Sequence, residues 1–231
     1  MTEIRLFATN AVRSVLDELL PTFERSSAIK AHIDYNTTAQ TLALLRGNAS
    51  ADAVIATEAG INELTALGKI IAGSRTNLAA TSIGVAVRKG APKPDIETVD
   101  AFKRTLLDAK SVAYTASGLS GMYFAKLIER LGIAEQIKAK ARIRPGGLIA
   151  EVVVAGEADL AVQMVSELLS VPGAQFVGPL PAEINQTSVI EGGILTGTRE
   201  SASARSLIQH LTTPESARVF QGKGLAPAAK A

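Results

Sequence analysis

Three times in this chain a short apolar segment ends in a cluster of small polar residues, and an amphipathic helix pattern follows. The three segments are residues 6–12, 33–39 and 112–121. A strand that leads into a helix through Asn, Ser, Thr and Gly leaves backbone N–H groups and hydroxyls free at the positive end of the helix dipole. Such turns favour a small anion, so the sequence predicts an α/β fold with an anion site.

The rest of the chain continues this alternation of strands and helices. Strand patterns cover residues 4–8, 31–35, 53–57, 82–87, 111–115, 141–144, 160–164, 176–180 and 187–195. Helix patterns cover residues 10–25, 39–46, 58–67, 100–107, 119–131, 148–155, 201–211 and 214–221. Alternation with short turns predicts βαβ units and a parallel sheet. No linker separates the halves, which indicates two α/β lobes that exchange strands.

Composition excludes several classes of function. Hydrophobic residues make up 47% of the 231 residues, which is enough for a large core. Lys and Arg are spread out, the net charge is only +2 and aromatics are 4%, so we expect no nucleic-acid partner. The chain has no Cys, and His32 and His210 are not in a metal-ligand spacing, so we expect no metal and no cofactor.

The order of several short motifs resembles the molybdate-binding-protein-like family of bacterial solute receptors, the type II periplasmic solute-binding proteins. The motifs are residues 7–12, 37–40, 51–55, 84–96, 120–123, 156–160, 166–168, 171–173 and 224–227. The resemblance implies two α/β lobes, residues 1–82 plus 187–231 and residues 83–186, with a ligand cleft between them. It also implies a small anionic ligand, an oxyanion or a carboxylate.

The family's ligand contacts fall on particular residues here. Those after the first strand fall on Asn10 and Ala11, and those after the second on Thr37 and Thr38. Further ligand contacts of the family fall on Ser120, Gly146 and Met164. Ala11 lacks the hydroxyl of the prototypes and Met164 lacks their tyrosine phenol, which argues against molybdate itself. The runs at residues 87–96 and 166–173 resemble a divergent branch of the family that includes an aconitate isomerase.

The polar residues at the helix starts have two readings from the sequence itself. Asn10, Thr37 and Thr38 are suited to capping helices, and the same positions at the end of a parallel sheet are suited to ligand contact.

Ser117 and Ser120 are stronger candidates for ligand contact. Gly121 beside them is a poor helix residue, and its presence suggests close approach of the backbone to a ligand. Gly146 follows a proline, so it either forms only a tight turn or presents its amide at the start of the next helix.

Arginines are candidates for a carboxylate clamp. Arg142 and Arg144 alternate along one predicted strand, and either form a fork toward the ligand or carry solvated charge at a strand edge. Arg13 lies in the first turn of a helix, where a cation opposes the dipole. Gln163 and Met164 end another strand, and one of them should face the ligand region. Glu167, just beyond, either acts there or decorates a helix.

Two functions remain open from the sequence. The favoured one is a non-catalytic solute receptor, a monomer that works with an ABC permease if it is exported. The alternative is a cytoplasmic isomerase of a small polycarboxylate, because an allylic proton shift needs only one acid/base group. Met1-Thr2-Glu3 leads into the first strand without a signal-peptide pattern, so we expect a cytoplasmic protein as written, or a periplasmic one if this is a mature form.

Overall fold

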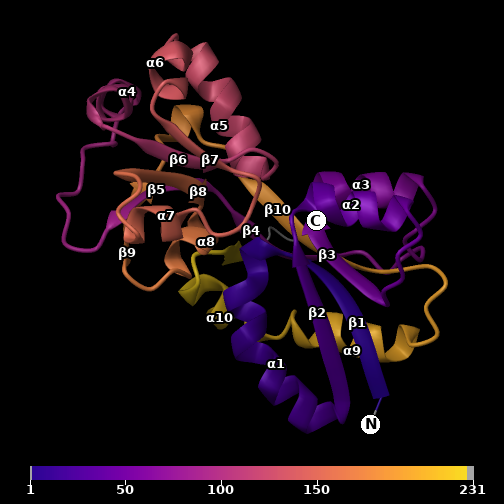
Figure 1. The fold of residues 1–231 in the computed structure, drawn as a ribbon. Coiled ribbons are helices and arrows are strands. Elements are labelled where there is room, and N and C mark those ends of the chain that lie inside the picture. Colours follow the sequence, from indigo (N-terminus) through magenta and orange to yellow (C-terminus); the bar gives the residue numbers. More distant parts are fainter. Residues whose placement is uncertain (1, 228–231) are drawn as a thin grey trace. The chain divides into compact units, whose positions relative to one another are not determined.

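The computed structural model describes residues 2–227 (Figure 1). Residues 1 and 228–231, which fall within the first predicted lobe, lie outside the described residues. The chain forms two compact units, which we call unit 1 (Met1–Thr81 with Ser188–Ala231) and unit 2 (Ser82–Thr187). It therefore passes from one unit to the other twice.

Unit 1 is built on a mixed sheet whose described strands have the order β11-β4-β10-β3-β1-β2. The strands are β1 (Thr2–Thr9), β2 (Ile29–Asn36), β3 (Ala53–Thr57), β4 (Thr76–Thr81), β10 (Ser188–Ile194) and β11 (Ala226–Pro227). β1 pairs in parallel with β2 and β3, whereas β10 is antiparallel to β3 and β4. The expectation of a wholly parallel sheet is therefore wrong, because the returning strand β10 inserts in the opposite direction.

Helices cover both faces of this sheet (Figure 1). They are η1 (Asn10–Val12, a 3-10 helix), α1 (Arg13–Ser27), α2 (Thr38–Arg46), α3 (Glu58–Ala66), α9 (Ser201–His210) and α10 (Pro214–Gly222). Side chains of β1 alternate between the two layers. Leu6 packs in the core with α1, α9 and α10, and Phe7 packs in the core with α2 and α3.

Unit 2 is built on a second mixed sheet with the order β7-β6-β8-β5-β9. Its strands are β5 (Ile83–Arg88), β6 (Val112–Thr115), β7 (Ala141–Arg144), β8 (Leu160–Met164) and β9 (Ala174–Pro179). β6 pairs in parallel with β7 and β8, whereas β5 is antiparallel to β8 and β9. Here too the predicted parallel arrangement holds for only three strands.

The two faces of this sheet carry different kinds of core. The helices are α4 (Val99–Asp108), α5 (Leu119–Arg130), α6 (Ala134–Lys138), α7 (Ala150–Val154), α8 (Val165–Leu169) and η2 (Ala182–Ile184). Large side chains such as Phe102 and Phe124 fill the core beneath α4, α5 and α6. On the other face Ala86, Ala113 and Ala161 present small side chains, which lets the short helix α7 approach the strands closely.

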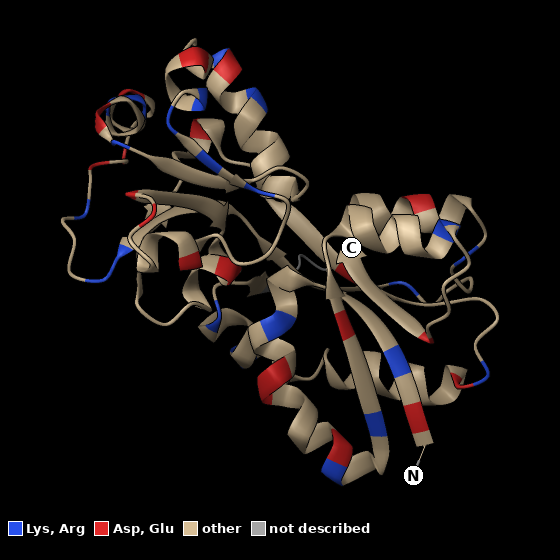
Figure 2. Cartoon of the chain, viewed as in Figure 1, with Lys and Arg blue, Asp and Glu red and all other residues tan. Residues whose placement is uncertain are grey.

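Charge is mixed along the elements of unit 1 rather than segregated. In Figure 2 positive and negative positions follow one another along α1, β1 and β2. Arg5 of β1 forms an ion pair with Asp34 of β2 at 2.6 Å, and Lys223 forms one with Glu18 of α1 at 2.8 Å.

Among the described residues, no helix is both long enough and apolar enough to cross a membrane.

Candidate functional site

The parallel strands of unit 1 end side by side, and each leads into a helix through a threonine. Thr9 ends β1, Thr37 follows β2 and Thr57 ends β3. Thr9 lies opposite Asn36 in the β1–β2 register, and all three threonines are less than a tenth exposed. We call the carboxyl ends of β1, β2 and β3, with the helix starts that follow them, edge 1.

Thr37 and Thr38 organise the start of α2. Thr37 Oγ1 accepts the backbone N–H of Gln40 at 3.2 Å, and the Gln40 side chain accepts the N–H of Thr37 at 2.8 Å, which completes a capping box. Thr38 Oγ1 accepts the N–H of Thr57 at 3.4 Å and so joins two helix starts. Thr37 therefore has the capping role. Thr57 was missed by sequence reasoning, although it precedes its helix just as Thr37 does.

The start of α1 differs from the other two. Asn10 forms no helix cap; its Oδ1 accepts a hydrogen bond from Arg13 Nη2 at 3.4 Å. The Ala11 side chain lies in the core, so only its backbone can contact a ligand. The Arg13 guanidinium stacks 4.1 Å from the Tyr35 ring centre, and its buried Nε has no hydrogen-bond partner. Burial and the neighbouring Asp17 carboxylate raise the pKa of the Tyr35 hydroxyl, so it stays protonated.

The parallel strands of unit 2 form a comparable arrangement. β6, β7 and β8 end at Thr115, Arg144 and Met164, and each is followed by a helix. Thr115 lies opposite Arg144 in the β6–β7 register. We call the carboxyl ends of these three strands, with the turns and helix starts that follow them, edge 2. The sequence-predicted residues Ser117, Ser120, Gly121, Arg144, Gly146 and Met164 all lie on it.

The turn from β6 into α5 starts its helix without a side-chain cap. The N-cap of α5 is Gly118, which supplies no side-chain hydrogen bond. Thr115 Oγ1 is buried without a partner, and Ser120 is only 2% exposed. A Cβ on Gly121 would lie 1.8 Å from the carbonyl oxygen of Thr115. The glycine that suggested close approach to a ligand is thus required by close approach to the chain's own strand.

Hydrogen bonds connect this turn to the one after β7. Ser117 Oγ donates to the carbonyl oxygen of Pro145, immediately before Gly146. Two predicted contact segments that are far apart in the sequence are therefore held together. The Ser117 hydroxyl hydrogen is occupied by this bond, so the serine can offer a ligand only its oxygen lone pairs.

Gln163 of β8 holds the turn after β7 from the other side. Its amide donates to the carbonyl oxygen of Gly147 and accepts the N–H of Ile149, both at 2.7 Å. Glu167, in the first turn of α8, is hydrogen-bonded to Gln163 and to the backbone of Met164. Burial outweighs these hydrogen bonds and raises the pKa of the Glu167 carboxyl to about 8. This carboxyl is therefore mostly protonated at neutral pH.

Two predicted contacts have other partners in the structure. Met164 is 5% exposed and packs in the core under α4 and α5, so its side chain fills the apolar interior. Arg144 pairs with Glu157 at 3.1 Å, and Arg142 donates to the neighbouring carbonyl of Ala141. β7 is an edge strand and both arginines are exposed, which corresponds to the solvated-charge reading rather than to a preformed fork.

The described residues contain no group of three or more His, Cys, Asp or Glu side chains arranged to hold a metal ion. Both histidines belong to unit 1 and neither is part of edge 1: His32 lies beside Glu3 of β1 and His210 against the Phe23 ring. What the two edges offer is therefore hydroxyls, helix-start amides, one stacked arginine and one buried carboxyl.

Comparison with known proteins gives consistent results. Residues 4–226 match the family described as "Bacterial extracellular solute-binding protein". An aconitate isomerase from Pseudomonas sp is 33% identical over 233 residues, which cover 98% of this chain and 88% of that protein. These findings confirm the resemblance that the motifs indicated.

Solved structures show the same fold at much lower sequence identity. The periplasmic molybdate-binding protein of Azotobacter vinelandii has a TM-score of 0.82 at 16% identity, covering 98% of this chain and 100% of that one. The sulfate-binding protein of Mycobacterium tuberculosis has a TM-score of 0.79 at 17% identity, covering 99% of this chain and 88% of that one. The predicted periplasmic-binding-protein fold is confirmed, and the chain belongs to the bacterial extracellular solute-binding proteins.

Proposed function

We propose that the protein binds a small carboxylate and that the β6–α5 turn is its principal anion-binding element. The proposal rests on one observation: α5 begins without a side-chain cap beside a buried, unpartnered Thr115 hydroxyl. The first intrahelical bond of α5 runs from the N–H of Met122 to the carbonyl of Gly118, so the amides of residues 119–121 have no acceptor within the helix. Three amides, a hydroxyl and the helix dipole together favour an anion.

A carboxylate suits the two edges better than a tetrahedral oxyanion does. Ala11 and Met164, where the molybdate-binding prototypes carry a hydroxyl and a phenol, have their side chains in the cores. Arg13 at edge 1 keeps a guanidinium with no carboxylate partner among the described residues, and guanidinium pairs bidentately with carboxylates. The relative that is 33% identical is named for aconitate, a tricarboxylate.

Edge 1 offers a second set of groups for an anion. Its candidates are the backbone of Asn10 and Ala11, the hydroxyls of Thr37 and Thr38, and Arg13.

Membership of an extracellular solute-binding family also supports a location outside the cytoplasm and an ABC permease as partner.

Calorimetric titration and thermal shift with citrate, cis-aconitate, trans-aconitate, molybdate, tungstate, sulfate and phosphate test this proposal. A ligand at 100 times its dissociation constant should stabilise the protein by about 2.7 kcal/mol. Thr115→Ala and Ser120→Ala should each weaken carboxylate binding by about tenfold or more, as expected for hydrogen bonds to a charged group. Thr41→Ala is the matched control, because Thr41 Oγ1 is also buried without a partner but lies within α2.

Two results would contradict the proposal. Stabilisation by molybdate or sulfate but by no carboxylate would assign the site to tetrahedral oxyanions. Equal affinity in Ser120→Ala and the unaltered protein would remove the β6–α5 turn from the site.

The second candidate function is isomerisation of a small polycarboxylate, favoured by the aconitate isomerase relative. An allylic shift needs one group that takes a proton from a methylene carbon and returns it to the former vinyl carbon as the double bond moves. On edge 2 the buried Glu167 is the candidate, because its raised pKa places its protonation change near pH 8. Its ionised form would be the base, so turnover should rise with pH up to about 8.

Proton NMR of trans-aconitate incubated with the protein separates the two functions. Appearance of cis-aconitate, lost in Glu167→Gln while calorimetric affinity is retained, would establish the enzyme and its acid/base group. Binding without interconversion would leave a receptor. Interconversion that survives in Glu167→Gln would assign the proton transfer to another residue.

A further inference from the structure

A separate cavity lies in unit 1 at the other end of the sheet from edge 1. It encloses about 470 Å³ where β3 begins and β10 ends, between the loop of residues 48–52 and the loop of residues 195–199. The five residues of β3 separate it from edge 1, a span of roughly 16 Å. Ala51 and Asp52 of the 51–55 motif line this cavity, but no residue that the sequence suggested for ligand contact does, and edge 1 does not include it.

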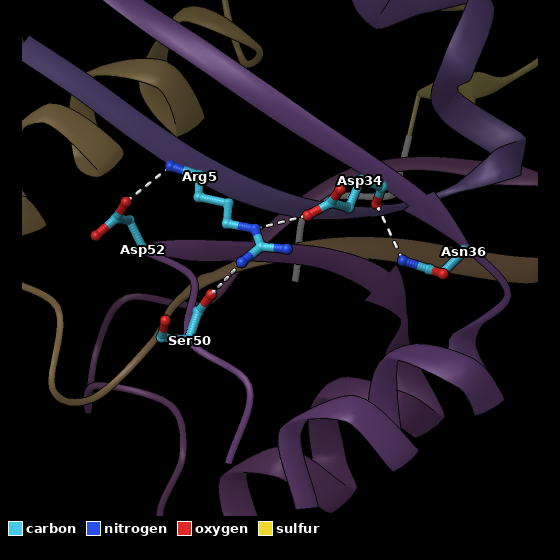
Figure 3. Close-up of polar contacts among 5 residues, drawn as sticks. All are labelled: Arg5, Asp34, Asn36, Ser50 and Asp52. Atoms are coloured by element: carbon cyan, nitrogen blue, oxygen red, sulfur yellow. Dashed lines mark hydrogen bonds and ion pairs between the residues drawn. The ribbon is translucent and has the colours of Figure 1, made fainter. Parts of the chain in front are cut away.

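Arg5 and Asp52 are among the residues that line the cavity. Figure 3 shows the polar contacts that they make. The N–H of Arg5 donates to Asp52 at 2.7 Å, and the hydroxyl of Thr198 donates to the other oxygen of Asp52 at 2.5 Å. The guanidinium of Arg5 donates to Asp34 at 2.6 Å and reaches the carbonyl oxygen of Ser50 at 3.5 Å. Both loops are thereby tied to β1, and both carboxylates are already engaged.

Two other cations on the wall have no carboxylate partner within residues 2–227. Lys69 Nζ contacts only the side-chain oxygen of Asn48, at 3.3 Å, and the structure gives Arg199 no ion pair or hydrogen bond within the described residues. The charge of Arg5 is offset by its ion pair with Asp34. Lys69 and Arg199 then outnumber the single lining carboxylate, Asp52, so the cavity carries a net positive charge.

Cations held around a partly enclosed space attract counter-ions more strongly than isolated surface charges do, because water screens them less. We infer that this cavity is a second anion site, which takes a small dianion of the phosphate or dicarboxylate class between Lys69 and Arg199. The inference is independent of the proposed function, since the cavity shares no residue with edge 1 or edge 2.

Titration of the 15N-labelled protein with inorganic phosphate and, separately, with succinate tests the inference by amide NMR. We expect saturable shifts at the amides of Ser50, Ala51 and Gly197. Lys69→Ala combined with Arg199→Ala should lower the affinity measured at these amides by about tenfold or more. The matched control is Lys30→Ala combined with Arg205→Ala, two unit 1 cations outside this cavity, which should leave the affinity unchanged.

The outcomes separate this site from the carboxylate site. Shifts confined to residues 115–121 would support the proposed function and overturn the second site. The second site would also be overturned if the shifts at residues 48–52 and 195–199 persist when Lys69 and Arg199 are both replaced by alanine. The same holds if they disappear equally in the Lys30 and Arg205 control. Saturation by phosphate but not succinate would narrow the site to phosphate-class dianions, and the reverse result would narrow it to dicarboxylates.

Discussion

Replacing Glu167 with glutamine should stabilise the folded protein at neutral pH. The Glu167 carboxyl is less than a tenth exposed and accepts hydrogen bonds from Gln163 and Met164, which an amide oxygen can also accept. A glutamine therefore keeps the contacts and, being neutral at every pH, avoids the free-energy cost of protonating the carboxyl when the protein folds at neutral pH. Nothing else at this position has to move, because the two side chains have nearly the same shape.

The magnitude follows from the difference between the two pKa values. The Glu167 carboxyl titrates at about 8 in the folded protein and at the ordinary 4.5 when exposed. Because the folded value is the higher one, its contribution to stability is full below pH 4.5 and is lost as the pH rises toward 8. At pH 7 the loss is about 3 kcal/mol. The variant does not titrate there, so its advantage over the unaltered protein should grow by that amount between pH 4.5 and pH 7.

Urea unfolding followed by far-ultraviolet circular dichroism at pH 4.5, 6, 7 and 8 measures this advantage. Glu151→Gln is the control, because Glu151 also lies in the first turn of a five-residue helix of unit 2 but is exposed. Its free energy of unfolding should follow that of the unaltered protein within about 0.5 kcal/mol at every pH. If the difference in free energy of unfolding between Glu167→Gln and the unaltered protein is also constant with pH, the folded protein does not hold that carboxyl protonated. The argument from burial then fails.

Three other substitutions have defined expectations. Gly121→Ala should abolish stable folding of unit 2, because the added Cβ would overlap the backbone of β6. Gly222→Ala is the control, because Gly222 has open space around it, and it should change the melting temperature by no more than a few degrees. Arg75→Met should cost about 3 kcal/mol in urea unfolding, because it leaves the buried Glu191 carboxylate without its two-contact partner; a cost below 1 kcal/mol would contradict this. Thr37→Ala should cost about 1 kcal/mol by loss of the capping box, with rescue by serine at that position.

Most helices and strands could be predicted from the sequence because their signals are local. The predicted strands at residues 53–57, 141–144 and 160–164 coincide with β3, β7 and β8. β4 was missed, since its Thr-Asn-Leu-Ala-Ala-Thr segment has few β-branched or aromatic residues to mark it. α6 and α8 were also missed, because a five-residue segment shows little helical period. α7 is equally short, but a helix was predicted there after the Pro-Gly-Gly turn.

The helix starts that make up the candidate site were predictable in position, but their contacts were not. Small polar residues after strands correctly indicated where the helices start, including the cap at Thr37. The ion pair of Arg144 could not be predicted, because Glu157 lies in the turn between α7 and β8 and meets Arg144 only after folding. The same holds for Gln163, which joins β8 to the turn after β7 across fourteen residues.

The sequence by itself determined the alternation of strands and helices, the polar helix starts and the family. Each of these depends on short patterns of residues that are neighbours along the chain. Only the tertiary structure decided that β10 enters its sheet antiparallel, that Gly121 meets the backbone of Thr115, and that Glu167 is buried. Those features depend on segments brought together from distant parts of the chain. Burial, which sets the protonation of Glu167, is a property of the packed neighbours and not of the residue itself.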